Sequence, residues 1–146
     1  MKSKWYKSIL YLSAVAVLGY GVLSACATNK KTKSKADFSS VVGREWRAKS
    51  IAGTSITEAW PTLKFSEEKL SGQTTCNRMS ASYHAEGENI TIGNIKATKM
   101  LCENRTVEEN YLNALSQVKK WSVKRRQLYL LDADGKELLV FSEIKH

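Results

Sequence analysis

The sequence predicts an α+β fold, in which a small and mostly antiparallel β-sheet of about eight strands curls, or closes into a cracked barrel, around one α-helix. Three observations predict it. Short runs of alternating apolar and polar residues recur about every 8–12 residues, with turn residues between them. The spacing of the apolar residues changes to that of a helix in only one segment, close to residues 107–119. The chain has 146 residues, which is enough for a single domain.

The first 25 residues are set apart from this domain. Lysines at positions 2, 4 and 7 precede a mostly apolar run at 9–22. As a helix this run would span about 21 Å, less than the bilayer's apolar core of about 30 Å, so it fits the h-region of a secretory signal peptide. Residues 23–26 (LSAC) resemble the bacterial lipobox. We therefore expect a lipoprotein signal peptide over 1–25 and a palmitate-carrying anchor on Cys26; a thiol behind an uncleaved anchor is the alternative.

The formal net charge of +9, from 23 basic and 14 acidic residues, does not indicate nucleic-acid binding. Much of the excess lies in the signal peptide and in the segment after it, as lysines at positions 2, 4, 7, 30, 31, 33 and 35. The rest of the chain has nearly balanced charge and no cluster of basic residues of the kind that binds DNA or RNA. Residues 26–40 have the polar composition of a flexible tether, and its lysines could favour anionic lipid headgroups.

The domain is expected over residues 41–146. Most of its predicted elements are strands. Trp46 alternates with polar neighbours, and a turn at 53–55 follows that strand. Pro61 fits the start of the next strand but not its middle. A short turn at 86–88 indicates a hairpin further on. The predicted strands cover 45–52, 62–65, 69–72, 80–84, 89–92, 95–100, 121–123, 127–131 and 137–141.

One helix is predicted, from about residue 107 to residue 119. Thr106, with Glu109 three residues later, forms a capping box ahead of it. The apolar residues that follow share one helical face, which can cover the apolar side of the sheet: Val107, Tyr111, Leu112, Leu115 and Val118. After it, Asp134 and Gly135 indicate the turn of a last hairpin.

Two segments of this domain carry a family resemblance. Residues 72–78 (GQTTCNR), followed about 20 residues later by 98–102 (TKMLC), resemble the META domain, the family of HslJ-like bacterial lipoproteins. The order of strands and turns is similar from Trp46 to Phe141, although Thr75 stands where many members have glycine. The resemblance implies a cracked barrel around a helix, a shape shared with some secretin pilot lipoproteins. It also implies an association with envelope stress and with resistance to novobiocin, without an established molecular activity.

The cysteines give one further expectation. With Cys26 assigned to the lipid anchor, Cys76 and Cys102 remain in a chain exported to an oxidising compartment, which favours a disulfide between them. Two buried thiols are the alternative. A zinc site would need more ligands, and only His84 and His146 are available, at spacings that match no zinc signature. We expect no metal and no cofactor.

Asn77 and Arg78 are the candidate polar site. Asn77 is expected to satisfy backbone groups in the turn after Cys76, with a ligand or partner carboxylate as the alternative, and Arg78 to pair with a nearby acid. We expect no enzyme, because no catalytic constellation is apparent. The favoured function is a non-catalytic binding or interaction protein, using a gap between sheet and helix for a protein partner or a hydrophobic ligand. A pilot- or chaperone-like lipoprotein for a secretion or outer-membrane partner is the alternative. Ala27, in place of aspartate after the anchor, favours the periplasmic face of the outer membrane.

Overall fold

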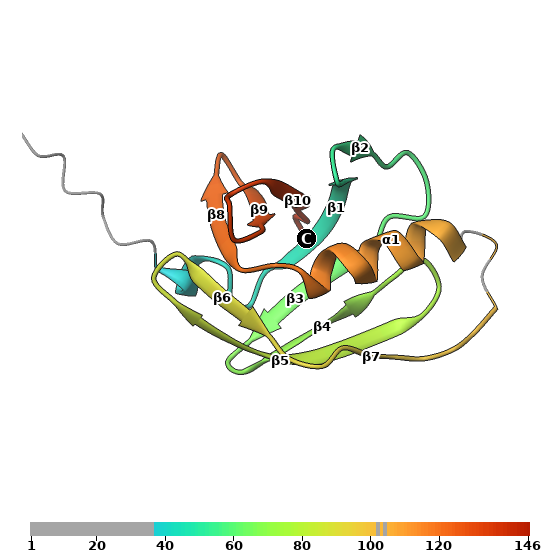
Figure 1. The fold of residues 1–146 in the computed structure, drawn as a ribbon, viewed down its shortest axis with the longest axis horizontal. Helices are drawn as coiled ribbons and strands as arrows, with labels where there is room; N and C mark the ends of the chain where they lie inside the picture. Colours follow the sequence, from blue (N-terminus) through green and yellow to red (C-terminus); the bar gives the residue numbers. More distant parts are fainter. Residues whose placement is uncertain (1–36, 102, 104) are drawn as a thin grey trace, which may run out of the picture. The chain divides into compact units, whose positions relative to one another are not determined.

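The computed structural model describes residues 37–101, 103 and 105–146. Within this part, eight antiparallel strands close into a barrel, two further short strands extend it, and one α-helix packs against it (Figure 1). The predicted α+β class, with a curled sheet and one helix, is confirmed. The signal peptide, Cys26, the tether up to residue 36, and Cys102 lie outside the described residues.

Most strands that are consecutive in the sequence are also neighbours in the barrel. The barrel order is β1-β3-β4-β5-β6-β8-β9-β10, and the pairing of β10 with β1 closes it. β2 pairs with β1 and β7 pairs with β5. The strands are β1 (Glu45–Ile51), β2 (Thr54–Ser55), β3 (Thr62–Ser66), β4 (Lys69–Gln73), β5 (Arg78–Glu86), β6 (Asn89–Ile92), β7 (Lys96–Ala97), β8 (Lys120–Lys124), β9 (Gln127–Leu131) and β10 (Glu137–Glu143).

The barrel interior is filled by the apolar members of the alternating strands. Trp46 on β1, Leu63 on β3 and Trp121 on β8 are almost fully buried. Phe38, in the short 3-10 helix η1 (Phe38–Ser40), packs its ring edge-on against Phe65, with ring centroids 5.2 Å apart, and against Trp121, at 4.8 Å. The interior is therefore a packed core, which leaves the surface around the helix as the place for a binding site.

The helix α1 (Arg105–Ser116) lies against β1 and β10 (Figure 1). It buries Tyr111, Ala114 and Leu115, and the Tyr111 ring meets that of Phe141 at 6.3 Å between centroids. Val118, just beyond the helix, is buried too. The predicted apolar face is thus the face that packs against the barrel. None of the helices in the described residues is long and apolar enough to span a bilayer.

Several boundaries differ from the prediction. The helix begins two residues earlier and ends three residues earlier than expected. The capping-box prediction is wrong, because Thr106 lies inside the helix and Glu109 instead accepts a hydrogen bond from Arg105 Nε at 2.8 Å. The strand expected at 95–100 is limited to β7. Phe38 belongs to the segment expected as a tether, but its ring packs against Phe65 of the core.

A further difference lies after β1, where a turn was expected at 53–55. The turn itself is formed by Ala52 and Gly53, both with positive φ (47° and 82°). Two consecutive residues of positive φ suit the twist of a tight hairpin. Thr54 and Ser55 therefore return along β1 as the short strand β2. This hairpin forms one wall of the candidate site.

Candidate functional site

Asn77, the residue singled out in the sequence, lies at the centre of a buried polar cluster. Its side chain is 3% exposed. Oδ1 accepts hydrogen bonds from Thr98 Oγ1 and from the Met100 backbone N–H, both at 2.7 Å, and Nδ2 donates to the Met100 carbonyl at 3.2 Å. The Asn77 amide therefore joins the start of β5 to the segment that follows β7. It has the same partners that a backbone peptide group would have in a sheet.

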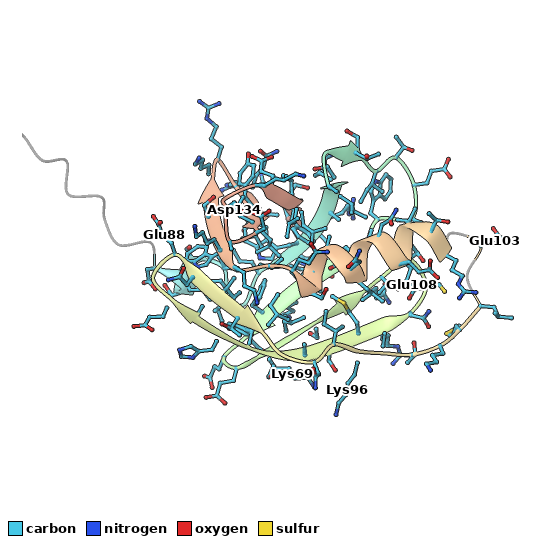
Figure 2. All side chains as sticks on the ribbon, in the orientation of Figure 1. Lys69, Glu88, Lys96, Glu103, Glu108 and Asp134 are labelled. Atoms are coloured by element: carbon cyan, nitrogen blue, oxygen red, sulfur yellow. The ribbon has the colours of Figure 1, made fainter. Side chains whose placement is uncertain are left out.

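Glu108 completes this cluster from α1. Its Oε1 accepts hydrogen bonds from Thr74 Oγ1 at 2.7 Å and from Asn77 Nδ2 at 2.9 Å. Thr74 also closes the turn before β5, because its backbone N–H donates to the Asn77 carbonyl at 2.8 Å. Figure 2 shows Glu108 directed from α1 towards the sheet, whereas Lys69 and Lys96 point away from the barrel. We call Thr74, Asn77, Thr98 and Glu108 the Asn77 cluster.

The geometry of the Asn77 cluster suits a structural role. The hydrogen bonds that Thr74 and Asn77 donate to Glu108 Oε1 tie the first turn of α1 to the connection between β4 and β5. Sequence reasoning missed both Thr74 and Glu108. Glu108 lies three residues before Tyr111 and seven before Leu115, which places it on the buried face of the helix. This spacing from Tyr111 and Leu115 was the feature of the sequence that could have identified Glu108 as buried.

The remaining polar candidates lie apart from one another. The Arg78 side chain is exposed and forms no ion pair with any described residue. His84 is exposed on β5 opposite Thr91, and His146 Nε2 lies 3.2 Å from Glu45 Oε2. In the part of the chain that the structure describes, no three histidine, cysteine, aspartate or glutamate side chains gather as a metal site would need. The predicted pairing of Cys76 with Cys102 stays a prediction, because Cys102 lies outside the described residues.

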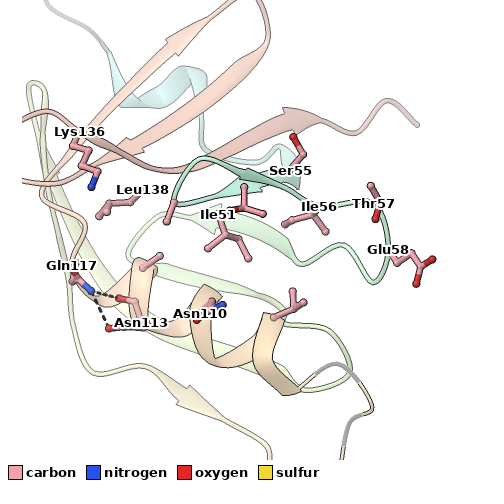
Figure 3. Close-up of a pocket in the computed structure, with 14 residues that line it drawn as sticks. Ile51, Ser55, Ile56, Thr57, Glu58, Asn110, Asn113, Gln117, Lys136 and Leu138 are labelled. Atoms are coloured by element: carbon pink, nitrogen blue, oxygen red, sulfur yellow. Dashed lines mark hydrogen bonds between the residues drawn. The ribbon is translucent and has the colours of Figure 1, made fainter.

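Between the β1–β2 hairpin and α1 the surface is hollowed into a cleft of about 580 Å³ (Figure 3). We call it the α1–β2 cleft. Its apolar side chains, which we call its floor, and its uncharged polar side chains come from both the hairpin and α1, and only one acidic and one basic side chain border it. It is lined by Ile51, Ala52, Thr54, Ser55, Ile56, Thr57, Glu58, Val107, Asn110, Asn113, Ala114, Gln117, Lys136 and Leu138.

The wall formed by α1 and the residue after it carries three amides. Asn110, Asn113 and Gln117 are three and four residues apart and so share one helical face. Gln117 Nε2 donates to Asn113 Oδ1 at 2.9 Å and to the Asn113 carbonyl at 3.3 Å. The amide of Asn110 forms no hydrogen bond with another described residue. Figure 3 shows Asn110 and Asn113 on the opposite side of the cleft from Ile51 and Ile56.

The location of this cleft agrees only in part with the expected gap between sheet and helix. It does lie beside the helix, but its lining is mixed rather than apolar throughout. A second hollow, of about 770 Å³, lies between α1 and the segment after β7, where Met100 and Leu101 are exposed. Its lining includes Leu101 and Arg105, which are next in sequence to residues 102 and 104, and those two lie outside the described chain. The α1–β2 cleft is therefore the better-defined candidate.

Two tyrosines near these elements have altered acidity. Burial raises the pKa of Tyr111, whose hydroxyl has no hydrogen-bond partner among the described residues. Burial, followed by the charges of Glu67 and Glu68, raises the pKa of Tyr83. The Tyr83 hydroxyl donates a hydrogen bond to the Ser66 carbonyl at 2.8 Å. Neither tyrosine lines the α1–β2 cleft, so we assign neither of them to a binding site.

Comparison with known proteins places this fold in context. The model of the META domain matches residues 39–145. An NMR structure of a protein from Burkholderia xenovorans is 25% identical and covers 74% of this chain and 86% of its own, with a TM-score of 0.59. Another protein solved by NMR is 22% identical, covers 73% of this chain and 94% of its own, and has a TM-score of 0.60. The sequence has no match among curated proteins.

Proposed function

We propose, from the premise that this chain belongs to the META domain family, that it is a lipid-anchored protein of the bacterial cell envelope whose domain binds a partner and catalyses no reaction. The resemblance drawn from residues 72–78 and 98–102 is confirmed by that membership. The proposed anchor rests on the lipobox at 23–26, in which Cys26 would carry the acyl chains. Residues 27–36 would then hold the domain at a distance from the bilayer.

The observation that carries the binding function is the composition of the α1–β2 cleft. Small-molecule and peptide sites combine an apolar surface with a few well-placed polar groups, and a volume of about 580 Å³ lies in their usual range. A catalytic site of the hydrolase kind needs a nucleophile within hydrogen-bond reach of a base. The lining includes the hydroxyls of Thr54, Ser55 and Thr57, but none of them forms a hydrogen bond with Glu58 or Lys136 in the described part of the chain. This supports binding in preference to catalysis.

The envelope location and the physiological role are finer parts of the same proposal. Ala27 after the anchor favours transport to the periplasmic face of the outer membrane. Binding that contributes to stress tolerance, including tolerance of novobiocin, is what the family resemblance suggests. The alternative function is that of a pilot- or chaperone-like lipoprotein, which would hold a secretion or outer-membrane partner. Both versions need a lipid anchor and an accessible cleft.

The anchor is tested by metabolic labelling with a palmitate analogue. The full chain and its Cys26→Ser variant are expressed in the host bacterium, and label and membrane fraction are measured for each. We expect the wild-type chain to carry label and to sediment with outer membranes, and the variant to carry none. Label on Cys26→Ser would show that the anchor assignment is wrong.

The binding role is tested separately in a strain that lacks the gene. Novobiocin tolerance is compared after complementation with the wild-type chain, with Cys26→Ser, and with an Asn110→Ala, Gln117→Ala double variant. Because both amides face solvent, the double variant should fold and keep its label. We expect it to restore tolerance poorly, as Cys26→Ser should. Full restoration by the double variant would argue against the α1–β2 cleft, and no phenotype in the deletion strain would argue against the role in resistance.

A further inference from the structure

The edge of β2 is the first feature that points to an occupant for the α1–β2 cleft. β2 pairs with β1 alone and ends the sheet, so its other edge faces no strand in the described part of the chain. The Ile56 N–H donates to the Lys49 carbonyl at 2.9 Å. Since hydrogen-bonding direction alternates along an antiparallel pair, the backbone groups of Ser55 point away from β1. An edge of this kind is a template for one more strand.

The amides on the opposite wall suit the same occupant. With a rise of about 1.5 Å per residue, Asn110 and Asn113 are about 4.5 Å apart along α1, and Gln117 lies one residue beyond its end. An extended chain presents peptide groups to one side about every 6.8 Å. Side-chain amides both donate and accept hydrogen bonds, as peptide groups do.

The floor and the charges of the cleft restrict the occupant further. Ile51, Ile56 and Leu138 offer apolar surface to side chains that point inward from a bound strand. Glu58 and Lys136 lie towards opposite ends of the cleft (Figure 3), so no region of it concentrates charge of one sign. Phosphate, nucleotide and charged headgroups would find no matching cluster of opposite charge there. An uncharged ligand is favoured.

We infer that the α1–β2 cleft takes a short, uncharged and extended segment of a partner polypeptide, which pairs with the outer edge of β2. The inference rests on the proposed function as a binding protein and specifies the partner's chemistry. The bound segment forms main-chain hydrogen bonds with Ser55 on one side, and its outward peptide groups meet the amides of Asn110 and Gln117. Its alternate side chains occupy the floor beside Ile56. Main-chain pairing then supplies affinity and the floor supplies selectivity.

The test uses the full chain in detergent, immobilised and panned against a phage library of random seven-residue peptides. We expect enriched sequences that are uncharged, with apolar residues at alternate positions. One enriched peptide is then synthesised and its affinity is measured for the wild-type chain, for the Asn110→Ala, Gln117→Ala double variant, and for Asn94→Ala. Asn94 is an exposed amide outside the cleft and serves as the matched control. The double variant should bind about tenfold more weakly, and the control should bind unchanged.

Modified peptides test the pairing without changing the protein. Two forms of the same peptide are N-methylated at alternate positions, one set on odd residues and one on even residues. Pairing with the edge of β2 predicts that one form loses binding at least tenfold and that the other keeps it. A neutral sugar, chitotetraose, is tested in parallel because amides and hydroxyls also suit carbohydrate.

The results that would overturn the inference are distinct. They are an absence of enrichment, equal affinity of the double variant, equal tolerance of both methylation patterns, or binding of chitotetraose in place of peptides. Each of these leaves the palmitate label on Cys26 and the novobiocin phenotype as they are. Conversely, a missing label or phenotype would remove the proposed function while the peptide affinity of the isolated chain persisted.

Discussion

Replacing Tyr111 with phenylalanine should stabilise this protein, although loss of a buried tyrosine hydroxyl ordinarily destabilises a fold. Tyr111 is fully buried under α1, and its hydroxyl has no hydrogen-bond partner among the described residues. An unpaired buried hydroxyl costs about 1–3 kcal/mol, whereas the phenylalanine ring keeps the contact with Phe141 and leaves only a void of oxygen size. The expected gain in unfolding free energy for Tyr111→Phe is about 1 kcal/mol.

The matched control is Tyr83→Phe, because the Tyr83 hydroxyl does donate a hydrogen bond, to the Ser66 carbonyl at 2.8 Å. That variant should lose about 1 kcal/mol. Thermal and urea unfolding of both variants measure the pair of effects, and a change of 1 kcal/mol corresponds to about 4–8 °C in a domain of this size. A destabilised Tyr111→Phe would show that the hydroxyl is satisfied in solution and would refute the reasoning.

The same tyrosine gives a test in alkaline solution. Burial raises the pKa of Tyr111 in the folded state above its ordinary value near 10. Below pH 10 both states keep the proton, and the shift has no effect on stability. Above pH 10 the unfolded chain releases the proton and the folded chain does not, so stability falls by about 1.4 kcal/mol per pH unit. Tyr111→Phe removes this contribution and should lessen the loss measured between pH 10 and pH 11.

Three further variants test the barrel and the Asn77 cluster by urea unfolding. Asn77→Ala should cost about 2–3 kcal/mol, because it removes the hydrogen bonds that Asn77 makes with Glu108 and with Met100; a loss below 1 kcal/mol would contradict the role given to the cluster. Gly72→Ala should cost about 2 kcal/mol or more, since its Cβ would lie on the Thr62 carbonyl oxygen, and unchanged stability would show that β3 and β4 can separate there. The β8–β9 turn uses arginines with φ of 49° and 63°, and Arg126 Nε lies 3.9 Å from Glu143 Oε2 in a pair whose arginine is exposed. Arg125→Asn with Arg126→Gly should therefore add about 1–2 kcal/mol, and a loss would mean that this ion pair outweighs the relief of backbone strain.

The strands and the helix could be predicted because their signals are local. Alternation around Trp46, Leu63 and Leu128 places those side chains inside the barrel, where they are fully buried or nearly so. The spacing of Tyr111 and Leu115 identifies the helical face that packs. These elements depend on a few consecutive residues, and the sheet they form encloses its apolar side as the barrel interior, with α1 packed against β1 and β10.

The parts that could not be predicted depend on contacts between distant residues. Glu108 follows Thr74 by 34 residues in sequence, and a carboxylate on a helix surface ordinarily indicates exposure. β2 contains two residues and exists because Ala52 and Gly53 turn the chain back on β1, which composition alone does not reveal. The α1–β2 cleft joins β1, β2, α1 and the start of β10, so no sequence window contains it.

The residues that carry the family resemblance and the residues that line the candidate site are almost entirely different. Asn77, Thr98 and Met100 use their hydrogen bonds within the fold, so the segments 72–78 and 98–101 help to specify how the barrel and helix join. The α1–β2 cleft draws on residues 51–58, 107–117 and 136–138 instead. The fold can therefore remain the same while the cleft changes. A chain in which Ser55 and Thr57 are both replaced by alanine should unfold within about 0.5 kcal/mol of wild type, because both side chains are exposed. A larger loss would show that this wall of the cleft is needed for folding, and the separation of fold from binding would fail.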